Sequence, residues 1–343
     1  MTESQTTIRP KAVTLKDVAL LAGVSVATAS KALNGRSYVH PKTRERVEEA
    51  ARKISFTPNS LAKGLLAGKS GTVGLLTSDL VGRFGLPVLI GAEDAFGTGK
   101  MSVLLCDARG DAIRESYHLQ ALLARRVDGL IVVGSSTDPR PSLGPDLPIP
   151  VVYAYSPSED PTDLSLVPDN IGGGSLAVDH LLSLGRRNIA HVTGERGYLA
   201  AQDRAAGAVQ RLADNGIELV GSHVLYGDWS EAWGRSATAA LLDRHPETDA
   251  IFCGNDQIAR GALDTIRSRG LEVPQDIAVI GFDDWQVLTL GARPQLSSVD
   301  MDLEALGRAA AQRLFAAIDG TEGRGTQQLP CRLVTRASTV EDS

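Results

Sequence analysis

Polar and aromatic side chains follow several short apolar runs of the chain. Asn255 comes directly after DAIFCG, Asp283 follows AVIGF, and Trp229 lies in GDWS after HVLY. Arg204 lies in QDRAAG, and Ser78 follows GLLT nearer the N-terminus. An aromatic face stacks on the apolar face of a sugar ring, while Arg, Asn and Asp bond its hydroxyl groups in pairs. These residue types therefore favour the binding of a small hydroxylated ligand.

Three of these residues also have a structural interpretation that the sequence leaves open. Trp229 is one of only three tryptophans and could equally fill a core or an interface. Asp283 could cap a following helix. Arg204 could form a salt bridge within its own domain.

Patterns that would support catalysis or metal binding are missing from the sequence. Six histidines occur without a close pair at metal-ligand spacing. There is no P-loop, no GxSxG and no GxGxxG motif. Cys106, Cys253 and Cys331 show no CxxC spacing, which is typical of small buried side chains in a reduced compartment. We therefore expect no enzyme activity, no metal and no cofactor.

The candidate ligand residues belong to an alternation of apolar runs and helical patterns that begins near residue 72. The expected strands are TVGLLTS, MSVLLCDA, VDGLIVVGS, IPVVYAY, RNIAHVTG, HVLYGD, TDAIFCG and DIAVIGF, with a last one at TRAST. The expected helices cover about 87–97, 112–125, 171–184, 202–215, 231–244, 256–269 and 302–318. Such alternation predicts an α/β fold with parallel sheets, and about 270 residues suit two of them. Ligands bind such folds at the carboxyl ends of the strands.

The N-terminal part differs from the rest in charge. Residues 1–69 hold 12 Lys and Arg against 5 Asp and Glu, whereas the remainder holds 23 against 36. A basic N-terminal part on an acidic body predicts a domain boundary and a partner that carries phosphates. The first residues, MTESQTTIRPK, lack the apolar core of a signal peptide, and no apolar run is long enough to span a membrane.

Residues 14–35 have the pattern of two short helices joined by a turn. Thr14 and Asp17 can cap the first helix, and Gly23 ends it. Ser25 can cap the second helix, and Asn34–Gly35 can end it. A third helix beginning near Pro41 has an apolar stripe of Val47, Ala50, Ala51 and Ile54. This pattern predicts an all-α helix-turn-helix, with an ordinary helical hairpin as the alternative.

At these residues the chain resembles the LacI/GalR repressor family. The stretches that carry the resemblance are TLKDVALLAGVSVATASKALNG, PKTRERVEEAA, FTPNSLAKGLLAGKSGTVGLL, VPDNIGGGSLAVDHLLSLGRRNIAHVTG, CGNDQIARGAL and VPQDIAVIGFDD. They occur in the family's order over nearly the whole chain. The glycine run 172–174 falls in the family's helix after DN, so we interpret it as packing rather than an anion site.

The resemblance implies that the second helix enters the major groove of DNA. Val26, Ala27 and Lys31 would read bases, the first two at thymine methyl groups and the lysine at guanine. The positions that match contacts to the DNA backbone are Ser25, Thr28, Ser30, Asn34, Thr43 and Arg44, and Leu15 matches a further DNA-binding position. His40 departs from the family, which often has Ser there.

The same resemblance divides the chain into residues 1–57 as the DNA-binding domain, 58–70 as a hinge and 71–343 as an effector-binding core. The hinge would form a helix over the minor groove, with Asn59 and Lys63 near the DNA and Leu65 as the wedge. Gly64 weakens such a helix. Without DNA, the alternative is a flexible linker.

The core is expected to be similar to periplasmic sugar-binding proteins. One lobe would comprise about 71–167 and 299–328, and the other about 168–298 and 329–341. The matching effector positions are Ser78, Arg204, Trp229, Asn255, Asp283 and Met301. Relatives often carry a polar residue where this chain has Met301.

These observations together predict a cytoplasmic, homodimeric transcriptional repressor. It would bind double-stranded operator DNA and respond to a mono- or oligosaccharide effector, either as inducer or as co-repressor. The alternatives are a sugar receptor without DNA function and an enzyme that uses the cleft. The short segment after the last strand favours a dimer over a coiled-coil tetramer.

Overall fold

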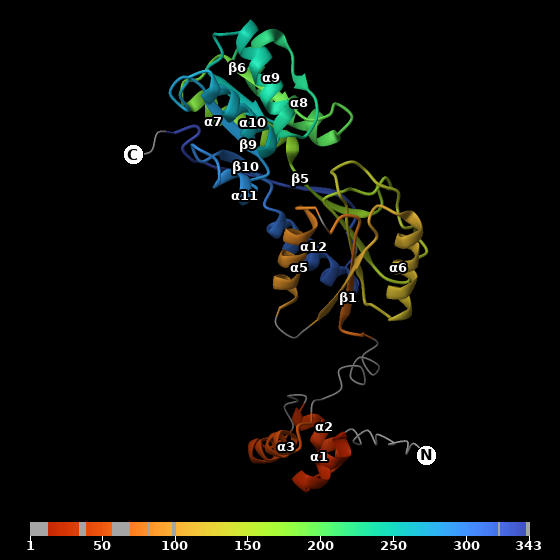
Figure 1. Cartoon of the computed structure of the whole chain (residues 1–343). Coiled ribbons are helices and arrows are strands. Elements are labelled where there is room, and N and C mark those ends of the chain that lie inside the picture. The colour runs from red at the N-terminus through yellow and green to blue at the C-terminus, as the bar shows by residue number, and fades with distance from the viewer. Residues whose placement is uncertain are drawn as a thin grey trace, which may run out of the picture. The chain divides into compact units, whose positions relative to one another are not determined.

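The computed structural model describes residues 13–33, 39–56, 69–80, 82–97, 101–321 and 323–340. The chain divides into two compact units, Met1–Ser70 and Gly71–Ser343. Figure 1 draws the elements of both, and each unit is described by itself.

The described residues of the N-terminal unit form three helices: α1 (Leu15–Ala22), α2 (Val26–Leu33) and α3 (Pro41–Lys53). The Thr14 N–H donates to Asp17 Oδ2 at 2.8 Å, and the Thr28 N–H donates to Ser25 Oγ at 3.1 Å. Gly23 ends α1 with a left-handed φ of 61°. The predicted caps and the helix-turn-helix are therefore confirmed, while the expected stop at Asn34–Gly35 lies outside the described residues.

Small side chains form the core of this unit. The buried residues are Val18, Ala19, Ala22, Ala29, Ala32, Val47, Ala50 and Ala51, and Ile54 packs against them. Because most are alanines, the helices approach closely around little apolar volume. The stripe predicted for the third helix faces this core.

The described part of the C-terminal unit forms two six-stranded sheets. The first has the order β11-β5-β4-β3-β1-β2, and the second has the order β12-β10-β9-β8-β6-β7. The strands of the first are β1 (Thr72–Thr77), β2 (Ser102–Asp107), β3 (Leu130–Val133), β4 (Val151–Ala154), β5 (Leu164–Pro168) and β11 (Gly325–Leu329). The strands of the second are β6 (Ile189–Thr193), β7 (Leu225–Tyr226), β8 (Ala250–Cys253), β9 (Ala278–Phe282), β10 (Ser297–Asp300) and β12 (Arg332–Val334). All strand pairs are parallel except β10 with β12.

Helices cover both faces of each sheet. The first sheet has α5 (Gly85–Phe96) and α12 (Leu303–Ile318) on one face and α6 (Ala112–Ala124) on the other (Figure 1). The second sheet has α7 (Asn170–Ser183) and α8 (Leu199–Asp214) on one face and α9 (Glu231–Arg244) and α10 (Asp256–Ser268) on the other. A 3₁₀ turn (Val220–Ser222) and the short α11 (Gln286–Thr289) complete it. The predicted fold class is confirmed: a helical N-terminal domain is followed in the chain by two doubly wound parallel lobes.

The chain passes between the two sheets three times. It leaves the first sheet after β5, returns to it after β10 and leaves it again after β11. We call the two halves the first lobe and the second lobe, after the first and second sheets.

In three helix pairs, each helix has a glycine at the crossing point that lies against the backbone of the other helix. A Cβ on Gly174 of α7 would lie 2.2 Å from the Arg204 carbonyl oxygen of α8, and one on Gly207 of α8 would lie 1.9 Å from that of Ile171. The pairs Gly91–Gly307, between α5 and α12, and Gly234–Gly261, between α9 and α10, are equally close. We call these the glycine crossings. The interpretation of the glycine run 172–174 as packing is supported, because any side chain there would collide with its neighbours.

The sequence pattern placed one strand wrongly and missed others. TRAST, expected as the last strand, follows β12, and its Ser338 and Thr339 side chains instead bond Ser297. Strand β11 was not predicted because its GTQQL sequence is polar. It is an edge strand that pairs with β5 alone, so it needs no apolar run.

Candidate functional site

A cavity of about 760 Å³ lies between the two lobes of the C-terminal unit. Its walls come from the segment between β1 and α5, the ends of β3 and β4, the start of α8, and the ends of β8 and β9. The lining residues are Leu80, Gly82, Arg83, Phe84, Leu86, Pro87, Ser135, Ser136, Thr137, Tyr155, Tyr198, Ala200, Arg204, Trp229, Asn255, Gln257, Asp283 and Trp285. The carboxyl ends of both sheets therefore meet here, where such folds bind ligands.

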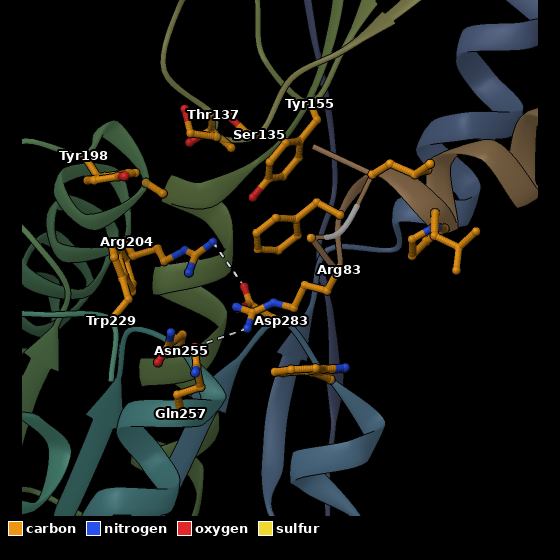
Figure 2. Close-up of a pocket in the computed structure, with 18 residues that line it drawn as sticks. Arg83, Ser135, Thr137, Tyr155, Tyr198, Arg204, Trp229, Asn255, Gln257 and Asp283 are labelled. Atoms are coloured by element: carbon orange, nitrogen blue, oxygen red, sulfur yellow. Dashed lines mark hydrogen bonds and ion pairs between the residues drawn. The ribbon is translucent and has the colours of Figure 1, made fainter. Parts of the chain in front are cut away.

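Asp283 lies between two guanidinium groups (Figure 2). Its Oδ2 pairs with Arg83 Nη2 of the first lobe, and its Oδ1 lies 3.5 Å from Arg204 Nη2 of the second. The Asp283 backbone has a φ of 99°, a conformation that costs a non-glycine residue of order 1–3 kcal/mol. The fold therefore tolerates strain at the residue that presents its carboxylate to the cavity.

Arg204 is held on three sides and is only 3% exposed. Its Nε donates to Asn170 Oδ1 at 2.9 Å, and its Nη1 donates to the Gly254 carbonyl oxygen at 2.5 Å. The guanidinium also lies 3.7 Å from the centre of the Phe282 ring. These contacts fix a cationic donor at the cavity wall without further rearrangement.

Aromatic rings form much of the remaining wall. Phe84, Tyr155, Tyr198, Trp229 and Trp285 are five of the chain's fifteen aromatic residues, a concentration that suits a ligand with flat apolar faces. Phe84 and Tyr155 stack at 4.8 Å between ring centres, and Tyr198 meets Trp229 edge to face at 6.0 Å. Among the described residues, the Trp229 Nε1–H finds no acceptor.

A second carboxyl group, that of Asp256, lies buried beneath Asp283. It accepts the Trp285 N–H at 2.7 Å and the Ser298 hydroxyl at 2.6 Å. Burial, together with the negative charge of Asp283, raises the pKa of Asp256 well above its ordinary value. Burial likewise raises the pKa of Tyr155. Asp283 is therefore the carboxylate offered to a ligand.

Four of the six predicted effector residues line the cavity: Arg204, Trp229, Asn255 and Asp283. Ser78 and Met301 do not. Met301 is buried, with its Sδ 3.6 Å from Arg204 Nη2, so it supports the arginine from behind. The Ser78 N–H donates to Val133 O at 3.3 Å, which joins β1 to β3.

The structural alternatives have mixed outcomes. Asp283 does not cap α11, whose N-cap is Trp285. Arg204 does lie within ion-pair distance of Asp283 in its own lobe, so the salt-bridge interpretation holds beside the ligand one. Asn255 caps α10, its Oδ1 accepting the Ile258 N–H at 2.8 Å.

The predicted DNA-binding residues of the described part lie on α2 and α3 or at their starts, except Leu15, which begins α1. Ser25, Val26, Ala27 and Lys31 are exposed; Thr28, Ser30, Thr43 and Arg44 are partly exposed. Leu15 is partly buried against the three-helix core. The remaining predictions, Asn34, Asn59, Lys63 and Leu65, lie outside the described residues.

Within the described ranges, no group of three or more His, Cys, Asp or Glu side chains is placed to hold a metal ion. No helix in the same ranges is long and apolar enough to cross a membrane.

Comparison with known proteins gives the same two parts. A model described as bacterial regulatory proteins, lacI family, matches residues 14–59, and one described as periplasmic binding protein-like domain matches residues 178–339. The HTH-type transcriptional regulator CelR of Thermobifida fusca is 34% identical over 330 residues, which cover 94% of this chain and 95% of CelR.

Solved structures are similar over comparable lengths. The lac repressor dimer bound to operator and the anti-inducer ONPF has a TM-score of 0.74 at 31% identity, and the match covers 96% of this chain and 100% of that one. A complex of the transcriptional regulator CelR with cellobiose has a TM-score of 0.63 at 30% identity, with 95% and 99% covered.

Proposed function

Because the chain belongs to the LacI family of bacterial regulatory proteins, we propose that it represses transcription as a homodimer whose operator affinity a sugar-like effector controls. It acts in the cytoplasm, and its cleft binds without catalysis. Val26, Ala27 and Lys31 read bases, residues 58–70 serve as the hinge, and residues 71–343 form the effector core. The alternative of a sugar receptor without DNA function has no specific support, since residues 14–59 match the family's DNA-binding part.

The observation that carries the effector part is the combination of Asp283, Arg204 and Trp229 in one cavity. The carboxylate accepts hydroxyl groups, the guanidinium donates to them, and the indole covers a ring face. A volume of about 760 Å³ falls within the usual range of ligand pockets and suits a mono- or oligosaccharide. Cellobiose is the first probe, because CelR has been solved with it.

The test measures DNA binding by fluorescence anisotropy, using upstream DNA from the protein's own locus. We expect a dimer on an approximately palindromic site, with an affinity that changes when cellobiose or another member of a sugar and nucleoside panel is added. Binding of one monomer to one half-site would contradict the dimer. If no panel member changes the affinity, the effector class is wrong.

Lys31→Ala tests the base-reading face. Loss of its donors to guanine should cost about 1–3 kcal/mol at one position of the operator. The matched control is Lys16→Ala, which removes the same charge from an exposed site on α1. The readout is binding-site selection, in which Lys31→Ala should change base preference and Lys16→Ala should not. Unchanged preference in Lys31→Ala would remove the assignment.

A further inference from the structure

Arg83 makes its polar contacts with the opposite lobe. It follows β1 of the first lobe, yet within the described part of the chain its two polar partners, Asp283 and Gln257, both belong to the second lobe. The Arg83 Nη1 lies 3.4 Å from Gln257 Oε1, and Nη2 contacts Asp283 Oδ2. Among the residues that the structure describes, the side chain therefore contributes no hydrogen bond to the lobe that carries it.

Its surroundings favour a strong ion pair. The Asp283 side chain is 3% exposed and that of Arg83 is 19% exposed, so water screens the pair weakly. The guanidinium also packs between the Phe84 ring of the first lobe, at 4.7 Å, and the Trp285 ring of the second, at 5.0 Å. Residues of both lobes therefore contact the Arg83 guanidinium group.

The segment that carries Arg83 is itself fixed. The Gly82 N–H donates to Asp79 Oδ1 at 2.6 Å, and the Asp79 N–H donates to Thr77 Oγ1 at 3.2 Å at the end of β1. A Cβ on Gly82 would overlap the Asp79 carboxylate, so Gly82 lies directly against that side chain. The backbone next to Arg83 is therefore held in place where the side chain crosses the cleft.

The Arg83–Asp283 pair also separates two cavities inside the cleft. A second cavity of about 610 Å³ lies on its other side, and Arg83, Phe84, Pro87, Asp283 and Trp285 line both cavities. The carboxylate that the proposed effector would bond is the one that Arg83 already occupies (Figure 2).

We infer that Arg83 is a positioning residue that ties the two lobes together across the cleft through Asp283. It stands where an effector hydroxyl would bind, a consequence that rests on the proposed function. An effector that reaches Asp283 Oδ2 displaces Arg83 and replaces an internal tie with its own contacts. The affinity for the effector and the relative position of the two lobes are then coupled through the Arg83 guanidinium group.

A single amide reports on this tie. The Leu199 N–H at the start of α8 in the second lobe donates to Asp138 Oδ1 of the first lobe at 2.9 Å. It lies in a different segment from the Arg83 pair, so it responds to separation of the lobes rather than to the substitution itself. The Leu130 and Gly254 amides, which bond Pro150 and Val192 within their own lobes, serve as internal references.

The experiment measures hydrogen exchange of these three amides in the full-length protein without ligand or DNA. In Arg83→Met, which keeps the apolar stem, Leu199 should exchange roughly tenfold faster while the two reference amides stay unchanged. Arg308→Met is the matched control, because Arg308 lines the second cavity and its ion pairs among the described residues are with Asp94, Asp302 and Glu304 of its own lobe. There all three rates should equal those of the wild type.

An unchanged Leu199 rate in Arg83→Met overturns the inference. If the reference amides also exchange faster, two further variants are compared: Asp283→Asn alone and Asp283→Asn combined with Arg83→Met. A tie through one pair predicts the same Leu199 rate in both, and a further increase in the double variant overturns it. Since neither ligand nor operator is present, the result is independent of the proposed function.

Discussion

The buried imidazole of His191 gives the second lobe a sensitivity to acid. Its Nδ1 lies 2.9 Å from the Phe252 carbonyl oxygen, and the ring stacks on that of Phe252 at 4.3 Å. Burial, with a smaller effect from the charge of Arg204, lowers the pKa of His191 from 6.5 to about 4. The folded state therefore holds this side chain neutral at pH values where the unfolded chain is protonated.

Because the pKa of His191 is lower in the folded state than in the unfolded chain, acid destabilises the protein. The stability contribution is fully present above pH 6.5 and is lost as the pH falls towards 4. Between pH 7 and pH 5 we expect His191 to remove about 2 kcal/mol from the free energy of unfolding. His191→Gln keeps a donor for the Phe252 carbonyl without titrating, so urea unfolding should show a smaller loss over this range. Parallel losses in both proteins would contradict the assignment.

Residues differ in how far the sequence could place them at the site. Arg204, Asn255 and Asp283 lie in local motifs or at the ends of recognisable strands, and they line the cavity. Arg83 and Trp285 have no such signal, because they meet Asp283 only when two lobes come together. Met301 was predicted to contact the ligand, but it lies beyond β10 and packs behind Arg204.

At the scale of elements, the glycine crossings set the distance between helices by backbone contact. In the α7–α8 pair this distance positions functional groups, since Asn170 begins α7 and Arg204 lies one turn before Gly207 on α8. Gly207→Ala would push its Cβ against the Ile171 carbonyl oxygen. The helices would have to separate, and Arg204 would move with them.

We expect Gly207→Ala to lower the free energy of unfolding by about 1–3 kcal/mol and to weaken effector binding as well. Gly91→Ala, in the equivalent crossing of α5 with α12, should cost similar stability and leave effector affinity near that of the wild type. Urea unfolding and calorimetric titration of the sugar found in the panel measure the two effects. An equal loss of affinity in both variants would show a general response to destabilisation.

Elements with a strong period were predictable to within about three residues, as for the expected helix 202–215, which the structure places at Leu199–Asp214. The short strand β10, with sequence SSVD, was missed. Its serines are buried because Ser297 and Ser298 bond Thr339 and Asp256 through their hydroxyl groups. Polar residues satisfied in this way carry no apolar pattern.

For the whole molecule, two ligands acting on one chain must influence each other equally. If the effector changes operator affinity by some factor, the operator changes effector affinity by the same factor. We expect a coupling of about 1–3 kcal/mol, which calorimetric titration with and without operator DNA measures. Asp283→Ala should abolish effector binding, so the operator affinity of this variant should no longer respond to the sugar. Identical effector affinities with and without operator would remove the switch.

The three passages between the sheets also govern the order in which this protein can fold during its synthesis. The second lobe needs little beyond β10 for its parallel strands, whereas the first lacks α12 and β11 until Leu329 has been made. Leu306, Ala310, Ala311 and Leu314 of α12 belong to the first lobe's core. The half that emerges first from the ribosome must therefore wait until most of the second lobe has been made, and its apolar sheet face stays open to chaperones until then.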